Sequence, residues 1–234
     1  MKKLGLIGGT SWHSSIEYYR AINENVNEHF GDNTNPPLML YNLNQSQIHR
    51  YQNEDRWDEI AKLLTQAALN LEKTGVEAVM FCANTPHKVY DAVSNAIHVP
   101  ILHIADATSK AIAAKEINKV CFIGTKFTMR ESYIADRISR KSIEVLVPKD
   151  DDKIEELHRI IQKELTYGVI NASSKAYVVD VVNSMIQEGA EGIVLGCTEF
   201  PLMLNGKDFS VPIFNTTTIH AEEATAFVLN KDDK

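Results

Sequence analysis

Two cysteines of this 234-residue sequence stand in similar surroundings, where their thiols could do chemistry. Cys82 and Cys197 each follow a short apolar run, and polar side chains come directly after each. A thiol has a reference pKa of about 8.5, so it can act as a nucleophile, a metal ligand or an acid–base group. Cys121 lies inside an apolar run instead, which predicts a core residue. Three widely spaced cysteines favour a reducing compartment without a disulfide framework.

The elements that must position these thiols are indicated by the hydrophobic pattern. Apolar runs predict strands at residues 4–7, 38–41, 78–81, 119–123 and 192–195. Residues 57–73 carry apolar side chains at helical spacing and are followed by Gly75, and a second helix is predicted over residues 177–188, before Gly189. Alternating strands and helices indicate an α/β fold with parallel sheets covered by helices.

The sequence also repeats itself at a long period. Cys82 comes 74 positions after Gly8, and Cys197 comes 73 positions after Gly124. Three segments recur in the same order, pairing residues 5–10 with 121–125, 75–82 with 189–197, and 99–101 with 211–213. The repeat predicts two pseudo-symmetric α/β domains, each with a mostly parallel sheet flanked by helices. We place one domain at residues 1–98 plus about 209–234 and the other at 99–208.

The repeat has a consequence for the two thiols. Ligands of open parallel sheets bind beyond the carboxyl ends of the strands, and both Cys82 and Cys197 follow predicted strands. Two similar domains that face each other would place one thiol on each side of a shared ligand. We therefore expect the active site in a cleft between the domains.

Other interpretations of the same residues remain open at this point. Cys82, His87 and Cys197 could ligate zinc, although no Cys-x-x-Cys or His-x-x-x-His pair is present. Residues 5–9 could form a dinucleotide loop, although the Gly-x-Gly-x-x-Gly spacing is missing. A cysteine hydrolase would use one thiol with a histidine such as His87 as base, which leaves the second thiol unexplained. A two-lobed binding protein without catalysis is a further alternative.

Three side chains near the motifs also have ordinary structural interpretations. Trp12 is typical of a core residue. His87 and Lys88 are expected to cap or cover the helix after Cys82, and their ordinary interpretation is a solvated helix face. Arg50 follows the predicted strand at 38–41, and its simplest interpretation is an ordinary charged residue on the surface.

Composition narrows the class of protein. The net charge is −7, and acidic and basic residues are interleaved, so the sequence lacks the basic stripe that nucleic-acid binding needs. The apolar run at residues 4–7 ends at Gly8-Gly9, which is too short for a signal peptide or a membrane span. We expect a cytoplasmic protein that does not engage a membrane.

The motifs together resemble those of the aspartate/glutamate racemase family, and within it most of all the aspartate racemases. The resemblance covers nearly the whole chain, and its motifs lie at residues 8–12, 82–88, 124–129, 164–165 and 196–199. The motifs most specific to this family are the paired segments Cys-Ala-Asn-Thr and Gly-Cys-Thr-Glu. It implies two pseudo-symmetric α/β domains with the active site between them, and activity without pyridoxal phosphate, another cofactor or a metal.

The resemblance also implies roles for particular residues. The catalytic pair corresponds to Cys82 and Cys197, and the basic residue that grips a side-chain carboxylate corresponds to Arg50. Residues implied to hold the substrate's α-carboxylate or to lie close to it are Thr10, Ser11, Asn84, Thr85, Thr125 and Thr198. Many relatives have a lysine before the glycine that follows Glu-Leu, whereas Tyr167 stands there in this chain.

The chemistry expected of this pair is a two-base proton transfer. One thiolate would remove the α-proton of an amino acid, and the opposite thiol would return a proton to the other face. The sequence-based hypothesis is cofactor-independent interconversion of L- and D-aspartate by a homodimer. A broader amino-acid or glutamate racemase and a non-catalytic amino-acid binding protein are the alternatives.

Overall fold

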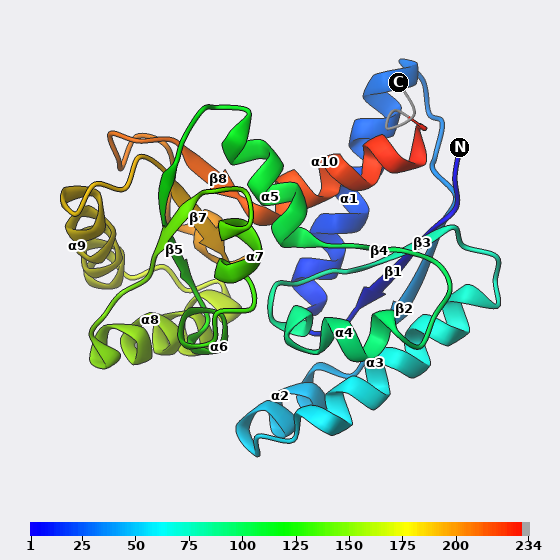
Figure 1. Cartoon of the computed structure of the whole chain (residues 1–234), viewed down its shortest axis with the longest axis horizontal. Helices are drawn as coiled ribbons and strands as arrows, with labels where there is room; N and C mark the ends of the chain where they lie inside the picture. The colour runs from blue at the N-terminus through cyan, green and yellow to red at the C-terminus, as the bar shows by residue number, and fades with distance from the viewer. Residues whose placement is uncertain (231–234) are drawn as a thin grey trace. The chain divides into compact units, whose positions relative to one another are not determined.

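The computed structural model describes residues 1–230 and divides them into two compact units (Figure 1). The first unit contains residues 1–104 and 217–230, and the second contains Ala105–Thr216. Each unit has one sheet of four parallel strands flanked by helices. Among residues 1–230, no helix has the length and apolar character needed to cross a membrane.

The sheet of the first unit has the order β2-β1-β3-β4. Its strands are β1 (Leu4–Gly8), β2 (Leu38–Asn42), β3 (Ala78–Phe81) and β4 (Ile101–Leu102). The helices are α1 (Trp12–Phe30), α2 (Gln45–Asn53), α3 (Trp57–Glu72), the 3₁₀ helix η1 (Thr85–Val89), α4 (Tyr90–Ser94) and α10 (Thr216–Val228). The central strands read as continuous apolar runs because helices cover both faces of the sheet.

Two hydrophobic clusters lie on opposite faces of this sheet. On one face, Tyr18 and Ile22 of α1 and Ala221 of α10 pack against Leu6 and Met80. On the other face, α3 contributes its buried stripe to a cluster that also contains Ile7 and Phe81. The first unit therefore contains both ends of the described chain in one core.

The second unit repeats this topology with the order β6-β5-β7-β8. Its strands are β5 (Lys119–Gly124), β6 (Glu144–Leu146), β7 (Ile193–Gly196) and β8 (Ile213–Asn215). Its helices are α5 (Ile104–Ala113), α6 (Lys126–Arg130), α7 (Ala135–Ser139), α8 (Asp151–Lys163), the 3₁₀ helix η2 (Leu165–Tyr167), α9 (Ala172–Gln187) and the 3₁₀ helix η3 (Phe200–Leu202). The predicted fold class, with its duplicated parallel α/β sheets, is confirmed.

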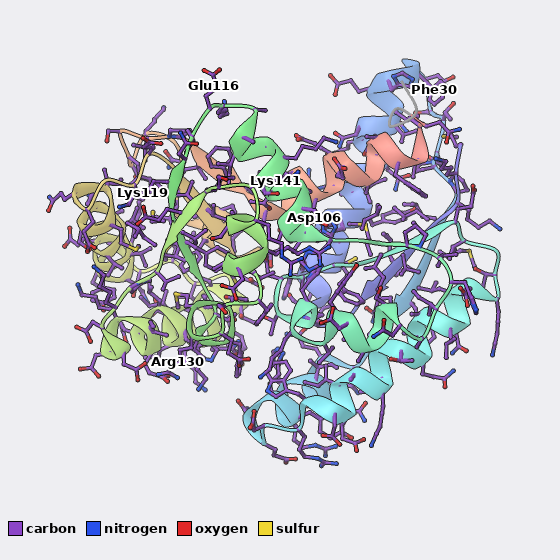
Figure 2. The ribbon with its side chains drawn as sticks, in the orientation of Figure 1. Phe30, Asp106, Glu116, Lys119, Arg130 and Lys141 are labelled. Carbon is purple, nitrogen blue, oxygen red and sulfur yellow. The ribbon has the colours of Figure 1, made fainter. Side chains whose placement is uncertain are left out.

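Ion pairs fix the helix that follows the central strand of the second unit. Arg130 lies at the end of α6 (Figure 2). It binds Asp151 at 2.6 Å and Glu155 at 2.7 Å, both on α8. At the other end of α6, the N–H of Lys126 lies 3.5 Å from Nδ1 of His158. The two helices therefore run antiparallel, and α8 ends on the side of the sheet where β5 ends.

The boundaries between the units lie a few residues later than residues 98 and 209, where the sequence placed them. β4 pairs with β3, so the first unit continues to Ile104. β8 pairs with β7, so the second unit continues to Thr216. These edge strands have two and three residues, too few for a hydrophobic pattern to reveal them.

Candidate functional site

Cys82 is the first residue beyond β3, at the carboxyl end of the first unit's sheet. Its N–H donates to the carbonyl of Ile7 at 3.0 Å, and its carbonyl accepts the hydroxyl of Ser14 at 2.5 Å. The side chain is 2% exposed, and burial raises the pKa of the thiol well above its ordinary value. In the free protein this thiol therefore carries its proton at neutral pH.

The turn after β1 brings Thr10 and Ser11 to the same end of the sheet, because β1 and β3 are neighbours. Gly9 has a φ of +85°, and a Cβ there would overlap the backbone of Leu43, so the turn requires glycine. Thr10 is buried beside this turn. The hydroxyl of Ser11 accepts the N–H of Ser14 at 3.4 Å, so Ser11 also serves as the N-cap of α1.

The segment after Cys82 is buried as well. Asn84 is 4% exposed and Thr85 is 8% exposed, and Thr85 begins η1. His87 is also buried, so its interpretation as part of a solvated helix face is wrong. Both of its ring nitrogens face backbone groups, so the imidazole is not placed to take a proton from a thiol, as a cysteine hydrolase would require.

Cys197 holds the matching position in the second unit, directly after β7. Its Sγ donates to Oε2 of Glu199 at 2.9 Å, and the hydroxyl of Thr198 donates to the same oxygen at 2.7 Å. Burial raises the pKa of Cys197, and the neighbouring Glu199 carboxylate raises it further. A proton acceptor is therefore already hydrogen-bonded to this thiol.

Thr125 follows β5, the neighbour of β7, and so lies at the carboxyl end of the second sheet together with Cys197. It is the N-terminal flanking residue of α6, and its hydroxyl lies 3.4 Å from that of Thr128. Each unit therefore combines one buried thiol with hydroxyl groups from the turn after its first strand. The strand ends thus bring Thr10, Ser11, Asn84 and Thr85 together with Cys82, and Thr125 and Thr198 together with Cys197.

Arg50 lies on α2 of the first unit and is exposed. Its guanidinium carbon lies 5.3 Å from the centre of the Tyr51 ring. Together with Asn44, Ser46 and Gln47 it lines a surface hollow of about 290 Å³. A cation surrounded by polar, uncharged side chains can bind a small carboxylate.

Two other interpretations of the sequence have clear outcomes. Trp12 is 51% exposed at the start of α1, so its assignment to the core is wrong. Cys121 is fully buried inside β5, where burial raises its pKa to about 12, and its assignment to the core is confirmed. Among residues 1–230, no cluster of three or more His, Cys, Asp or Glu side chains could hold a metal ion.

A carboxylate that sequence reasoning missed is that of Glu199. The two loops match residue by residue, because Pro86 and Pro201 each lie four positions after their cysteine and within the first turn of a 3₁₀ helix. Glu199 then stands where Asn84 stands in the first unit. The signal available in the sequence was the Cys-x-Glu spacing, which places a carboxylate two residues after the thiol.

The fold and the site together define a class of duplicated α/β proteins that have a buried thiol at the end of the third strand of each sheet. The chain belongs to the Asp/Glu/hydantoin racemase family, whose model matches residues 7–224. The family resemblance noted in the sequence is thereby confirmed.

Individual relatives agree with this assignment. A candidate Asp/Glu racemase from Yersinia pestis is 40% identical with a TM-score of 0.92, and the match covers 98% of this chain and 100% of that one. An aspartate racemase homologue from Pyrococcus horikoshii OT3 is 36% identical with a TM-score of 0.83, and both chains are fully covered. The broad specificity amino-acid racemase RacX from Bacillus subtilis (strain 168) is 25% identical over 174 residues, or 74% of each protein.

Proposed function

We propose that this chain interconverts L- and D-aspartate without a cofactor, using Cys82 and Cys197 as its two acid–base groups. The observation that carries the proposal is the duplication of a buried thiol at the carboxyl end of the third strand of each sheet. Membership of a racemase family supports the same chemistry.

The proposed reaction exchanges one proton at the α-carbon. The thiolate of one cysteine takes the α-proton, and the electron pair left on Cα delocalises into the α-carboxylate. The thiol of the other cysteine donates its proton to the opposite face of Cα. The two cysteines end the turnover with their protonation states exchanged, and proton exchange with water restores the starting state.

The surroundings of the thiols assign their roles in this proposal. Cys197 is protonated in the free protein, and during turnover Glu199 takes its proton, which yields a Cys197 thiolate and a neutral carboxylic acid. Cys82 has no such contact among its hydrogen bonds, which join its backbone to Ile7 and Ser14, and it keeps its proton. Cys197 is therefore the proposed first base and Cys82 the proposed first acid.

The substrate's carboxylates need hydrogen-bond donors and a cation. For the α-carboxylate we assign the side chains of Asn84 and Thr85, with the backbone N–H groups around Asn84 and Thr198, as donors. Thr10, Ser11 and Thr125 are assigned to positions close to it. For the side-chain carboxylate we assign Arg50, whose planar guanidinium can bind both oxygens at once. A contact of this type contributes about 1.5–3 kcal/mol, or roughly ten- to a hundredfold in affinity.

The first test is racemisation of single amino acids, followed by circular dichroism without added cofactor. We expect activity with aspartate, and Cys82→Ser and Cys197→Ser should each lower it by about two to four orders of magnitude. Cys121→Ser is the matched control and should retain activity, because Cys121 belongs to the core of β5. Full activity in either of the first two variants would exclude the two-base reaction.

The second test concerns the choice of substrate. Arg50→Ala should weaken aspartate turnover by about ten- to a hundredfold, mainly through KM, and Arg50→Lys should restore only part of it. Turnover of alanine or serine should change little in both variants. Normal aspartate kinetics in Arg50→Ala would mean that Arg50 is a surface charge. Similar rates across many amino acids in the unmodified protein would favour a broad specificity like that of the racemase RacX.

A further inference from the structure

The buried His87 lies just behind the Cys82 loop, and the proposed reaction does not use it. Its Nδ1 lies 3.0 Å from the carbonyl oxygen of Ala83 and 3.1 Å from that of Asn84. Both partners can only accept, so Nδ1 carries the proton. Its Nε2 accepts the N–H of Ile104 at 3.3 Å and therefore presents a lone pair.

These contacts specify one neutral tautomer of His87 and place it against the catalytic loop. Ala83 and Asn84 are the two residues that directly follow Cys82, so a single N–H group holds the backbone on which both the thiol and the Asn84 amide depend. The third contact joins the same ring to Ile104, just beyond β4. His87 thus fastens the loop after β3 to the end of the neighbouring strand.

The surroundings of His87 hold the imidazole in place and keep it neutral. Its ring packs against Phe81 at 5.1 Å, His103 at 4.3 Å and His220 at 6.0 Å between centroids. Burial lowers the pKa of His87 well below its usual value, and the neighbouring histidines lower it further. In turn, Nδ1 of His220 lies 3.0 Å from the Tyr18 hydroxyl, and the His103 ring packs against Tyr90.

The second unit has no imidazole at the matching position. Five residues after Cys197 stands Leu202, whose side chain is 54% exposed. The two otherwise equivalent thiol loops are therefore held differently: the Cys82 loop by a buried ring, and the Cys197 loop by contacts of its own Glu199 side chain.

We propose that His87 is a positioning residue for Cys82, which acts by holding the carbonyls of Ala83 and Asn84 and not as a base. An effect of His87 on racemisation rests on the proposed function. Its effect on the position of the Cys82 thiol does not depend on that function. The substitution of His87 should therefore affect one thiol of the pair selectively.

The test is the rate of alkylation by iodoacetamide, resolved by mass spectrometry into the Cys82 and Cys197 peptides over a range of pH. In His87→Ala, loss of the clamp should raise the rate at Cys82 by about tenfold, the effect of one or two lost hydrogen bonds, while Cys197 stays within about twofold. His87→Asn places an amide N–H near the position of Nδ1 and should restore most of the native rate.

His220→Asn is the matched control, because His220 is a fully buried imidazole of the same cluster whose hydrogen bonds reach Tyr18 and Leu102. Because the hydrogen bonds of His87 to Ala83 and Asn84 remain, it should change the ratio of the two alkylation rates much less than His87→Ala does. In racemisation, His87→Ala should lower kcat more than it raises KM. Equal changes at both thiols, or no change at Cys82 in both His87 variants, would overturn the proposal. A selective change at Cys82 in a chain that racemises nothing would preserve the positioning role and reject the proposed function.

Discussion

Asn84 and Glu199 occupy matching positions two residues after the two thiols, and they differ by one methylene in length and in the group at the end of the side chain. An amide beside Cys82 is neutral, whereas the carboxylate beside Cys197 is both a charge and a proton acceptor. A nearly symmetric pair of loops therefore contains an electrostatic asymmetry. It is set by residue type alone, because both side chains are buried to a similar degree.

The variant Glu199→Gln separates the two effects of this carboxylate. Removing the charge should lower the pKa of Cys197, because the carboxylate opposes ionisation of the thiol, so alkylation of Cys197 at a given pH should become faster. Removing the proton acceptor should nevertheless slow racemisation by about two to four orders of magnitude. Alkylation rates and racemisation rates measured on the same preparation check both directions.

The control for this variant is Glu116→Gln, an exposed carboxylate of the second unit that should change neither rate (Figure 2). Unchanged racemisation in Glu199→Gln would show that another group deprotonates Cys197.

For single residues, the sequence was a good guide to which side chains belong to the candidate site. It was a poorer guide to how deeply each side chain is buried. Cys82 and Cys197 could be singled out because the repeat places them at equivalent positions, and Cys121 could be set aside by its apolar neighbours. The sequence predicted an exposed His87 and a buried Trp12, and the structure has the reverse. The burial of a single side chain depends on what packs over it from distant segments. His87 is covered by rings from residues 103 and 220, which no local pattern brings together.

Among the elements, β5 and β7 pack so closely at their ends that glycine is required. Gly196 is the last residue of β7, and a Cβ there would overlap the Phe122 ring of β5. Gly196→Ala should therefore destabilise the second unit by about 1–3 kcal/mol, the usual cost of overpacking a core, and should displace the adjoining Cys197. Urea denaturation followed by circular dichroism gives the change in the free energy of unfolding.

Gly206→Ala is the matched control, because a Cβ at Gly206 meets nothing within 4 Å. Its free energy of unfolding should stay within about 0.5 kcal/mol of the original. A similar stability for both variants would mean that the Phe122 ring moves aside without cost.

The sequence predicted the central elements well and the peripheral ones poorly. The helix expected over residues 57–73 is α3 (Trp57–Glu72), and the strands expected before both cysteines are present. The helix expected from residue 177 begins at Ala172, because its first turn is polar and carries no apolar spacing. Short edge strands and helices of five residues hold too few side chains to produce a period.

For the molecule as a whole, the buried His87 predicts a loss of stability in acid. Its pKa in the folded chain is lowered, so the unfolded chain binds a proton that the folded chain resists. The contribution is complete above the unfolded pKa of about 6.5 and is lost as the pH falls from there toward the lower folded value. The urea midpoint should therefore decrease between about pH 7.5 and pH 5.

Tryptophan fluorescence is a selective probe for this prediction, because the chain has two tryptophans, Trp12 and Trp57, and both belong to the first unit. His87→Asn should reduce the pH dependence, whereas substitution of the exposed His13 should not. A midpoint that does not change with pH would contradict this account.

The expected homodimer stays a prediction for the molecule as a whole, and sedimentation equilibrium tests it. The exposed Ile16 and Tyr19 of α1 are the first residues to vary.

The return of α10 to the first unit sets an order of events during synthesis. Ala221, Ala224 and Val228 complete the core that Tyr18 and Ile22 begin. Those partners are made roughly two hundred residues apart, so a nascent chain must carry a half-covered apolar sheet until α10 has left the ribosome. The second unit, continuous from Ala105 to Thr216, has all of its strands available earlier. The Cys82 loop therefore matures after the Cys197 loop, although it is encoded first.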